Sequence, residues 1–441
     1  MWNMPMTSEI SKKTHRIIRV AILAEEPLGW GSGKHYFPMI LDYSWEKEDT
    51  IYHFSTSYIY DKDILQGQLT KKHFDVLLTP GGGVGDGEAV AKGFSYIPRV
   101  KKWKRMIANF IKEGGGYVGI CGGTAMFTAL QTKNKKPVTF LEKLYDKSAI
   151  GVSRVKSYYK DLAFPLFYPF QYTHPEIIGA TAYIFSFAPG KTKDDTMIHT
   201  GGVPIDFNVN TDHPIFSDLN TDKVRIRWWG GPGLIPPTHH SDDINVLAWY
   251  PDDALTEKTN TSIMAWRYKG RFLGLFKGLW KAFFLIKQTG ESLRDLLLYT
   301  YYLVGPWEQT DHRIDMDLAK KASITTEIYP NENKARILLC TSHPEYMIWW
   351  DGHITEEKGG NYHTMGEGFH RWHDIKPVSK SLVDEFTATW WLVRRFVAWT
   401  AKVPDKHLPP IEKGIMKEDA QKILSENIFW DGSLVNQMKN I

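Results

Sequence analysis

The sequence predicts an α/β protein with a mostly parallel sheet, a β-rich middle region and a helical insert. Three observations support this fold class. Apolar strand-like runs alternate with helical patterns between residues 17 and 127, and such alternation is typical of a parallel sheet with right-handed crossovers. The segments 215–247, 244–250 and 262–268 have strand character, and an amphipathic stretch follows them.

The first strands and helix follow in a regular order. Ile17–Leu23 is a continuous apolar run, as expected for a strand buried on both faces. A second strand is expected around 50–57, and a third at Phe74–Thr79 runs into the glycine loop 80–87. A helix should come next and stop at Gly114, since apolar residues recur at helical spacing: Val100, Trp103, Ile107, Phe110 and Ile111.

The helical insert is predicted from one apolar stripe with lysines between its members. The stripe consists of Phe272, Leu275, Phe276, Leu279, Trp280, Phe283 and Phe284. A helix of this kind packs on the core, or it lies on a membrane surface or a partner protein. Such a peripheral contact would use residues 272–303.

One main domain is expected at 16–350, with inserts at about 131–205 and 271–332. The strand Ala335–Cys340 belongs to this domain. Residues 351–403 should form a loop and a helix packed on it, and residues 404–441 a C-terminal appendage.

Composition narrows the function classes. The formal net charge of +4 over 441 residues is small, so no nucleic-acid partner is expected. Two cysteines exclude a disulfide scaffold and indicate a reducing compartment. No segment matches a spanning helix or a signal peptide, so a cytoplasmic location is expected. The oligomeric state is not predicted.

Cys121 lies in the most informative motif, Tyr117–Phe127. The motif reads as a strand, a glycine-bracketed cysteine and the start of a helix. A nucleophile on a strand-to-helix turn, called a nucleophile elbow, needs very small residues two places before and after it, and Gly119 and Gly123 stand there. The helix that follows would lower the pKa of the thiol and make it reactive. A buried core cysteine is the alternative.

A cysteine nucleophile needs a base, and the base needs an acid that fixes its tautomer. His343 and Glu345 follow the strand Ala335–Cys340 and are the candidates, although His343 could also be a core histidine. The oxyanion would be held by the amide of Gly122 and by that of Gly82 or Gly83.

These motifs together resemble the class I glutamine amidotransferase-like superfamily, and more narrowly its branch named after the biotin-protein ligase N-terminal domain. The matching segments are Pro80–Gly83, Gly119–Gly123, Asp212–Phe216, Trp228–Pro232 and His343–Glu345. The resemblance implies a flavodoxin-like sheet with helices on both faces and a Cys121–His343–Glu345 triad. It does not imply biotin ligation, and it leaves the substrate open.

Other residues are weaker candidates. Glu25, Gly230, Gly231, His239 and His240 would line the pocket or serve as ordinary loop and strand-end residues. The spacing of the histidines in a histidine-rich stretch is tolerable for metal ligands but forms no tight ligand pattern, so neither a metal nor a cofactor is expected. The stretch consists of His353, His363, His370 and His373.

Two functions remain in view. The first is a cysteine-dependent hydrolase or amidotransferase that acts on an amide or related acyl bond of a small-molecule or peptide-like substrate. The second is a non-catalytic binding or scaffold protein on the same fold, which uses the aromatic insert to dock on a membrane surface or a partner.

Overall fold

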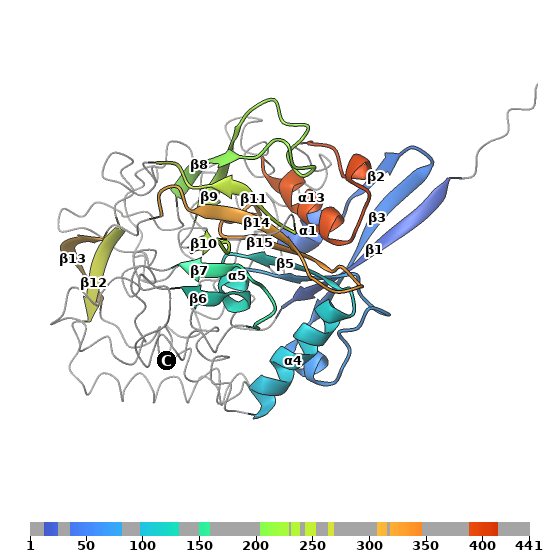
Figure 1. Cartoon of the computed structure of the whole chain (residues 1–441), viewed down its shortest axis with the longest axis horizontal. Coiled ribbons are helices and arrows are strands. Elements are labelled where there is room, and N and C mark those ends of the chain that lie inside the picture. Colours follow the sequence, from blue (N-terminus) through green and yellow to red (C-terminus); the bar gives the residue numbers. More distant parts are fainter. Residues whose placement is uncertain are drawn as a thin grey trace, which may run out of the picture.

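A mixed sheet runs through the molecule (Figure 1). The computed structural model describes residues 13–24, 36–81, 98–131, 150–158, 203–228, 231–238, 243–252, 263–268, 307–314, 318–345 and 388–412. The centre of the sheet consists of parallel strands in this spatial order: β3 (Thr50–Ile59), β1 (Thr14–Leu23), β4 (Val76–Thr79), β5 (Gly116–Ile120) and β15 (Arg336–Cys340). The predicted α/β class with a mostly parallel central sheet is confirmed.

The register of these strands fixes which residues meet at their carboxyl ends. Leu77 of β4 pairs with Tyr117 of β5, and Tyr117 pairs with Ile337 of β15. The strands therefore end side by side, β4 before Pro80, β5 before Cys121 and β15 at Cys340. β4 and β5 are buried throughout, which explains their continuous apolar sequences.

Antiparallel strands extend the sheet beyond β15. β14 (Ala322–Ile328) pairs with β15 and is followed by β10 (Gly233–Ile235), β7 (Lys156–Tyr158) and β6 (Ala129–Gln131), the last of which is parallel to β7. A branch from β14 carries β11 (Ile244–Trp249), β8 (Val203–Val209) and β9 (Lys223–Trp228). At the other edge, β2 (Ser44–Lys47) is antiparallel to β3. β12 (Ile263–Tyr268) and β13 (Trp307–Ile314) form a separate pair.

The described helices belong to two apolar clusters. α1 (Phe37–Leu41) and α13 (Trp390–Thr400) share one cluster with Val20, Leu78 and Val118 of the sheet. α4 (Pro98–Lys112) shares the other with alternate strand residues, and α2 (Asp61–Leu65) lies against α4. The predicted stripe of α4 is buried at Trp103, Ile107, Phe110 and Ile111, and Gly114 follows the helix with a positive φ of 94°.

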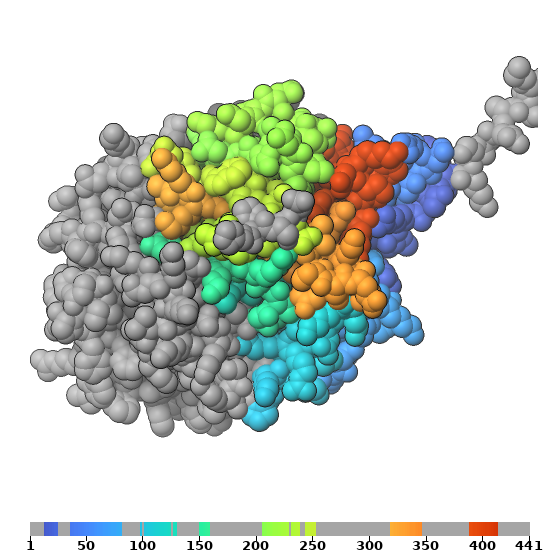
Figure 2. All heavy atoms as spheres, viewed as in Figure 1, coloured from blue at the N-terminus to red at the C-terminus, as the bar shows by residue number. Residues whose placement is uncertain are grey.

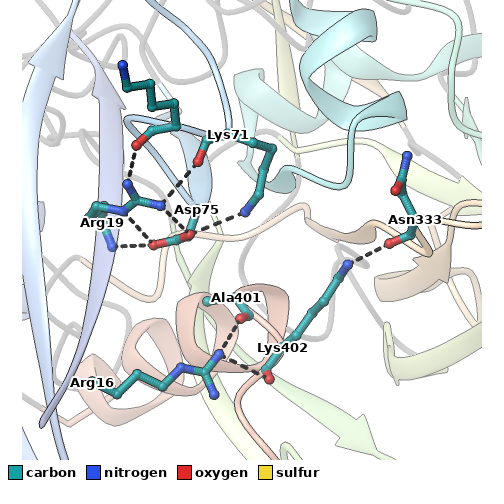
Figure 3. Close-up of polar contacts among 8 residues, drawn as sticks. Arg16, Arg19, Lys71, Asp75, Asn333, Ala401 and Lys402 are labelled. Carbon is teal, nitrogen blue, oxygen red and sulfur yellow. Dashed lines mark hydrogen bonds and ion pairs between the residues drawn. The ribbon is translucent and has the colours of Figure 1, made fainter.

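A polar network holds the amino-terminal side of the sheet (Figure 3). Arg19 of β1 donates from Nε and Nη2 to the carboxylate of Asp75, at 3.1 and 2.9 Å, and Lys71 pairs with the same carboxylate at 3.2 Å. Nearby, Arg16 donates to the Ala401 carbonyl after the end of α13. These contacts tie β1 to the loop before β4 and to the residue that follows α13 (Trp390–Thr400).

α13 is buried on every side, including its two arginines. Arg394 donates to the Ile40 carbonyl at 2.9 Å, while Arg395 donates to the Pro409 and Ile215 carbonyls at 2.7 and 2.9 Å. Figure 2 accordingly shows the atoms of 388–412 (red) beside those of 203–228 (green). α13, which lies within residues 351–403, thus contacts both the segment that contains α1 and residues 214–215.

The structure corrects one predicted segment and adds contacts to two others. The expected helical insert 271–332 contains two strands, β13 and β14. β14 is a buried segment rich in β-branched residues, and its backbone hydrogen bonds are formed with β15, which lies outside the expected insert. Within the expected insert 131–205, residues 156–158 join the sheet. Within the expected C-terminal appendage 404–441, the carbonyl of His407 accepts a hydrogen bond from the Trp45 indole at 2.8 Å.

Among the described residues, no helix has the length and apolar character needed to cross a bilayer.

Candidate active site

Cys121 occupies a strained turn between β5 and α5 (Gly122–Phe127). Its φ of 45° and ψ of −105° are unusual for a residue with a side chain, and they cost of order 1–3 kcal/mol. The side chain is nearly buried, with an exposed fraction of 6%. The predicted strand–cysteine–helix geometry is therefore present, and the positive φ is typical of a nucleophile elbow.

The bracketing glycines are required by close contacts within the turn. A Cβ on Gly119 would lie 3.0 Å from the carbonyl of Gly123, and a Cβ on Gly123 would lie 2.2 Å from the Thr79 carbonyl. The Tyr117 hydroxyl donates to the Gly123 carbonyl at 2.7 Å. The two glycines thus allow the first turn of α5 to pack against β5 and the end of β4.

The elbow is fastened to the neighbouring strand. The Cys121 amide donates to the Cys340 carbonyl at 2.7 Å, and Thr124 Oγ1 lies 2.8 Å from the carbonyl oxygens of both Gly119 and Cys340. The Cys340 amide in turn donates to Thr124 Oγ1 at 3.1 Å. Any movement of the elbow would therefore break hydrogen bonds to β15.

His343 and Glu345 form a buried pair just past β15. His343 Nδ1 lies 2.8 Å from Glu345 Oε1, and the exposed fractions of the two side chains are 2% and 0%. Because a carboxylate only accepts, Nδ1 carries the proton and Nε2 is left as the basic nitrogen. Glu345 Oε2 is buried, with no hydrogen-bond partner among the described residues. The carboxylate is thereby committed to the histidine.

Gly81 lies between the cysteine and the histidine. A Cβ on this glycine would lie 2.5 Å from His343 Cε1 and 2.7 Å from the Cβ of Cys121. Both side chains therefore border the same small space, which only a residue without a side chain leaves open. The structure brings together Cys121, His343 and Glu345 from two strands that are distant in the sequence.

The candidate oxyanion residues are only partly described. Gly122 directly follows Cys121, is buried, and begins α5. Gly82 and Gly83 lie outside the described residues, so the neighbour that the structure does describe is Gly81. The sequence predicted Gly81 only as part of the motif Pro80–Gly83 and not as a site residue. Its position could have been inferred from strand pairing: Thr79 pairs with Gly119, so Gly81 and Cys121 each lie two residues beyond a paired position.

A set of hydrogen bonds holds the end of β15, which leads into His343, against the loop that follows β9. The Tyr250 hydroxyl lies 2.8 Å from Thr341 Oγ1 and 3.0 Å from the Pro232 carbonyl, and the Trp228 indole donates to the Gly231 carbonyl at 3.0 Å. A Cβ on Gly231 would lie only 1.6 Å from the Thr341 carbonyl. Gly231, a predicted pocket residue, therefore packs on the strand end that carries His343.

The ionisation of the Tyr250 and Cys340 side chains is suppressed. Burial raises the pKa of the Tyr250 hydroxyl, and negative charge on Cys121 or Cys340 would raise it further. Burial likewise raises the pKa of the Cys340 thiol, whose sulfur donates to the Ser342 carbonyl at 3.5 Å. Tyr250 and Cys340 thus remain protonated around the proposed nucleophile.

The start of α13 donates hydrogen bonds to the backbone of the segment 343–345. Thr389 Oγ1 donates to the Pro344 carbonyl at 2.6 Å, and the Trp390 indole donates to the Glu345 carbonyl at 3.1 Å. This role of α13 was not predicted, because nothing in its local sequence pattern points to the His-Pro-Glu segment.

Several predicted residues cannot be compared with the structure. Glu25, Gly230, His239 and His240 lie outside the described residues, as do the histidine-rich stretch 353–373 and the aromatic stripe of 272–284. Within the ranges that the structure describes, no group of three or more His, Cys, Asp or Glu side chains is arranged to hold a metal ion.

No family model matches this chain, and a search of curated proteins found no match either. The geometry of the residues therefore carries the functional argument.

Proposed function

We propose that this protein is a cysteine-dependent hydrolase or amidotransferase that acts on an amide or related acyl bond. Cys121 is the nucleophile, His343 the proton shuttle and Glu345 the residue that orients His343. One observation carries the proposal: a cysteine with a φ of 45° borders the same space as a buried His–Glu pair. A purely structural cysteine would have no need of that strained backbone conformation.

The proposed reaction has two halves. In the first, Cys121 Sγ attacks the carbonyl carbon as its proton passes to His343 Nε2, the C–N bond breaks, and His343 protonates the leaving amine. In the second, His343 takes a proton from water as the water oxygen attacks the thioester carbon, the C–S bond breaks, and His343 returns the proton to Cys121 Sγ as the carboxylic acid leaves. Glu345 stabilises the imidazolium that forms in each half.

The developing oxyanion requires N–H donors. The proposal assigns Gly122 as one donor, since its amide follows the nucleophile at the start of α5, and Gly82 or Gly83 as the other. Hydrogen bonds of this kind act strongly in a site that excludes water, and the near-complete burial of His343 and Glu345 favours such a site.

A finer description of the fold belongs to the same proposal. The spatial order β3-β1-β4-β5-β15 and the two apolar clusters support a flavodoxin-like sheet with helices on both faces. The class I glutamine amidotransferase-like superfamily, in the branch of the biotin-protein ligase N-terminal domain, is the proposed relationship. We also propose a cytoplasmic location, which is supported by the two cysteines, both of them free thiols.

The test is alkylation of the full-length chain by iodoacetamide from about pH 5 to 9, read for each cysteine by peptide mass spectrometry. Cys121 should label rapidly well below about pH 8.5, the usual thiol pKa, and Cys340 should not. His343→Ala should abolish the rapid labelling, whereas His73→Ala, at an exposed position, should leave it unchanged. Slow labelling of Cys121 that ignores His343 would overturn the proposal.

A further inference from the structure

The start of α13 binds the backbone of the His-Pro-Glu segment. Thr389 Oγ1 donates to the Pro344 carbonyl at 2.6 Å, and the Trp390 indole donates to the Glu345 carbonyl at 3.1 Å. Both donor side chains are buried, with exposed fractions of 2% and 0%. The pairing of β15 with β14 and β5 ends at Cys340. The two bonds therefore hold a stretch of backbone that lies beyond the paired strand.

Thr389 uses its hydroxyl on this segment and not on its own helix. It occupies the N-cap position of α13, where a threonine side chain commonly accepts a hydrogen bond from a backbone N–H of the first helical turn. At this helix end, within the part of the chain that the structure describes, the Thr389 side chain forms no such cap. Its hydroxyl donates to the Pro344 carbonyl instead. A bond that would stabilise the helix is thus replaced by one that fixes the His-Pro-Glu segment.

Two neighbouring tryptophans differ in what their indoles bind. The Trp391 indole donates to the Ala388 carbonyl at 3.0 Å, three residues back in the chain, whereas the Trp390 indole donates to Glu345. Both rings belong to the same apolar cluster, and their exposed fractions are 4% and 0%. Trp391 therefore serves as a matched reference for the bond that Trp390 makes.

The Glu345 carboxylate must keep its place to orient the histidine. Its Oε1 lies 2.8 Å from His343 Nδ1, and a hydrogen bond weakens steeply when its length or angle departs from the favourable range. This bond fixes the tautomer in which Nε2 is basic, and it stabilises the imidazolium that would pair with a Cys121 thiolate. A shift of the Glu345 backbone would therefore reach Cys121 through His343.

We propose that Thr389 and Trp390 are positioning residues, because they fix the backbone from which a carboxylate orients the proposed base. The inference rests on the proposed function, since it concerns the Cys121–His343–Glu345 site. The two residues act through two backbone carbonyls and take no part in proton transfer. The start of α13 is thus a working part of the site.

The test measures the rate constant of iodoacetamide at Cys121 in the full-length protein from about pH 5 to 9, by peptide mass spectrometry. Trp390→Phe and Thr389→Val each remove one of the two bonds. Thr389→Ser keeps the hydroxyl, and Trp391→Phe removes an indole bond that does not involve the His-Pro-Glu segment. Urea unfolding measures the stability of each variant separately.

The expected result is a change in the pH profile of Cys121. In Trp390→Phe and Thr389→Val the midpoint should rise by up to about one pH unit, and below both midpoints the rate constant should fall about three- to tenfold. The reason is that a misplaced imidazolium stabilises the thiolate less. Thr389→Ser should stay within about twofold of the wild type. Trp391→Phe should leave the midpoint unchanged, even where it lowers the free energy of unfolding.

A double-mutant cycle checks that the effect passes through the histidine. In a His343→Ala background, Trp390→Phe should change the Cys121 rate constant less than about twofold, because the group that it positions is gone. The inference is overturned by an unchanged midpoint in both single variants, by the same shift in Trp391→Phe, or by an equal loss in the His343→Ala background.

Failure of the proposed function would look different. Cys121 of the wild type would then label slowly, with a midpoint near the usual thiol pKa of about 8.5 and no response to His343→Ala. Failure of the inference alone leaves rapid labelling that depends on His343. If Trp390→Phe does not fold, as judged by near-ultraviolet circular dichroism, Thr389→Val is compared with Thr389→Ser. A higher midpoint in the valine variant supports the inference, and equal midpoints overturn it.

Discussion

Cys121 and Cys340 stand at the ends of neighbouring parallel strands and are joined by a 2.7 Å backbone hydrogen bond, yet their environments differ. Cys340 is the last residue of β15, fully buried, and its thiol donates to a carbonyl. Cys121 lies one residue beyond β5, in a strained turn that borders His343. Both are largely buried, so burial alone does not distinguish a structural thiol from a proposed nucleophile. Backbone conformation and the nearest base do.

The largest expected difference is in acyl transfer. With p-nitrophenyl acetate as a generic acyl donor, Cys121→Ala should lower the burst rate of p-nitrophenol release at least about a thousandfold, since the nucleophile is gone. Cys340→Ala should change it less than about threefold, because the burial that raises the Cys340 pKa keeps this thiol protonated. Stopped-flow absorbance measures both, and equal losses would contradict the assigned roles.

The next largest effect is expected from a substitution that fills the space between Cys121 and His343. Gly81→Ala places a methyl group 2.5 Å from His343 Cε1 and should slow iodoacetamide labelling of Cys121 about a hundredfold by displacing the base. Gly233→Ala is the matched control, since its added methyl group would contact mainly the flexible side chain of Lys321. Labelling of Cys121 unaffected by Gly81→Ala would mean that the two side chains do not act together.

Glycine substitution should have opposite effects at the two cysteines. Cys121→Gly relieves the positive φ and should raise the free energy of unfolding by about 0.5–1 kcal/mol after the loss of the buried thiol is counted. Cys340→Gly should lower it by about 2–3 kcal/mol, since it removes a buried side chain and loosens β15. Urea unfolding measures the two changes. The same sign for both would argue that Cys121 is unstrained.

The alkaline pH dependence of stability should reveal Cys340. Its folded pKa is raised by burial, so above the unfolded value of about 8.5 the unfolded chain releases a proton that the folded chain keeps. Stability is therefore lost as the pH rises. Wild type should lose about 1.4 kcal/mol more than Cys340→Ala between pH 7.5 and 9.5. Parallel curves for the two proteins would show that this thiol ionises freely.

The smallest expected change is in the free energy of unfolding when Asp75, just before the amino-terminal end of β4, is replaced. Burial opposes the ionisation of Asp75, but hydrogen bonds from Arg19 and the charge of Lys71 outweigh it and lower the Asp75 pKa. Asp75→Asn should cost about 0.5–1 kcal/mol at pH 7 in this partly exposed pair. The cost should begin to fall below about pH 4, the usual pKa of this carboxyl group in the unfolded chain, and should vanish only once the pH has dropped through the lowered pKa of the folded protein. Urea unfolding at both pH values checks this, and labelling of the two cysteines should not change.

Local features of the site were predictable from the sequence, and features that depend on strand pairing were not. Gly119 and Gly123 bracket Cys121 within a few residues, so their spacing alone predicted the turn that the structure has. His343 and Glu345 were predicted from chemistry, and the fold brings them to the cysteine.

Pairing across the chain explains the misses. Arg227 alternates with the apolar Ile226 and Trp228 along β9, and its bridge to His343 depends on a partner far away in the sequence. β14 looked like part of an insert, because its place between β15 and β10 depends on partners far away in the sequence. Such partners leave no periodic signal within the strand itself.

The contacts from Thr389 and Trp390 to the His-Pro-Glu segment bear on the order in which the protein is made. The elbow cysteine emerges from the ribosome early, more than two hundred residues before the helix that holds its proposed base in place. Until that helix docks, a nascent chain carries the thiol without the assembled triad. The two hydrogen bonds from this segment to the His-Pro-Glu backbone can therefore form only after most of the chain has been synthesised.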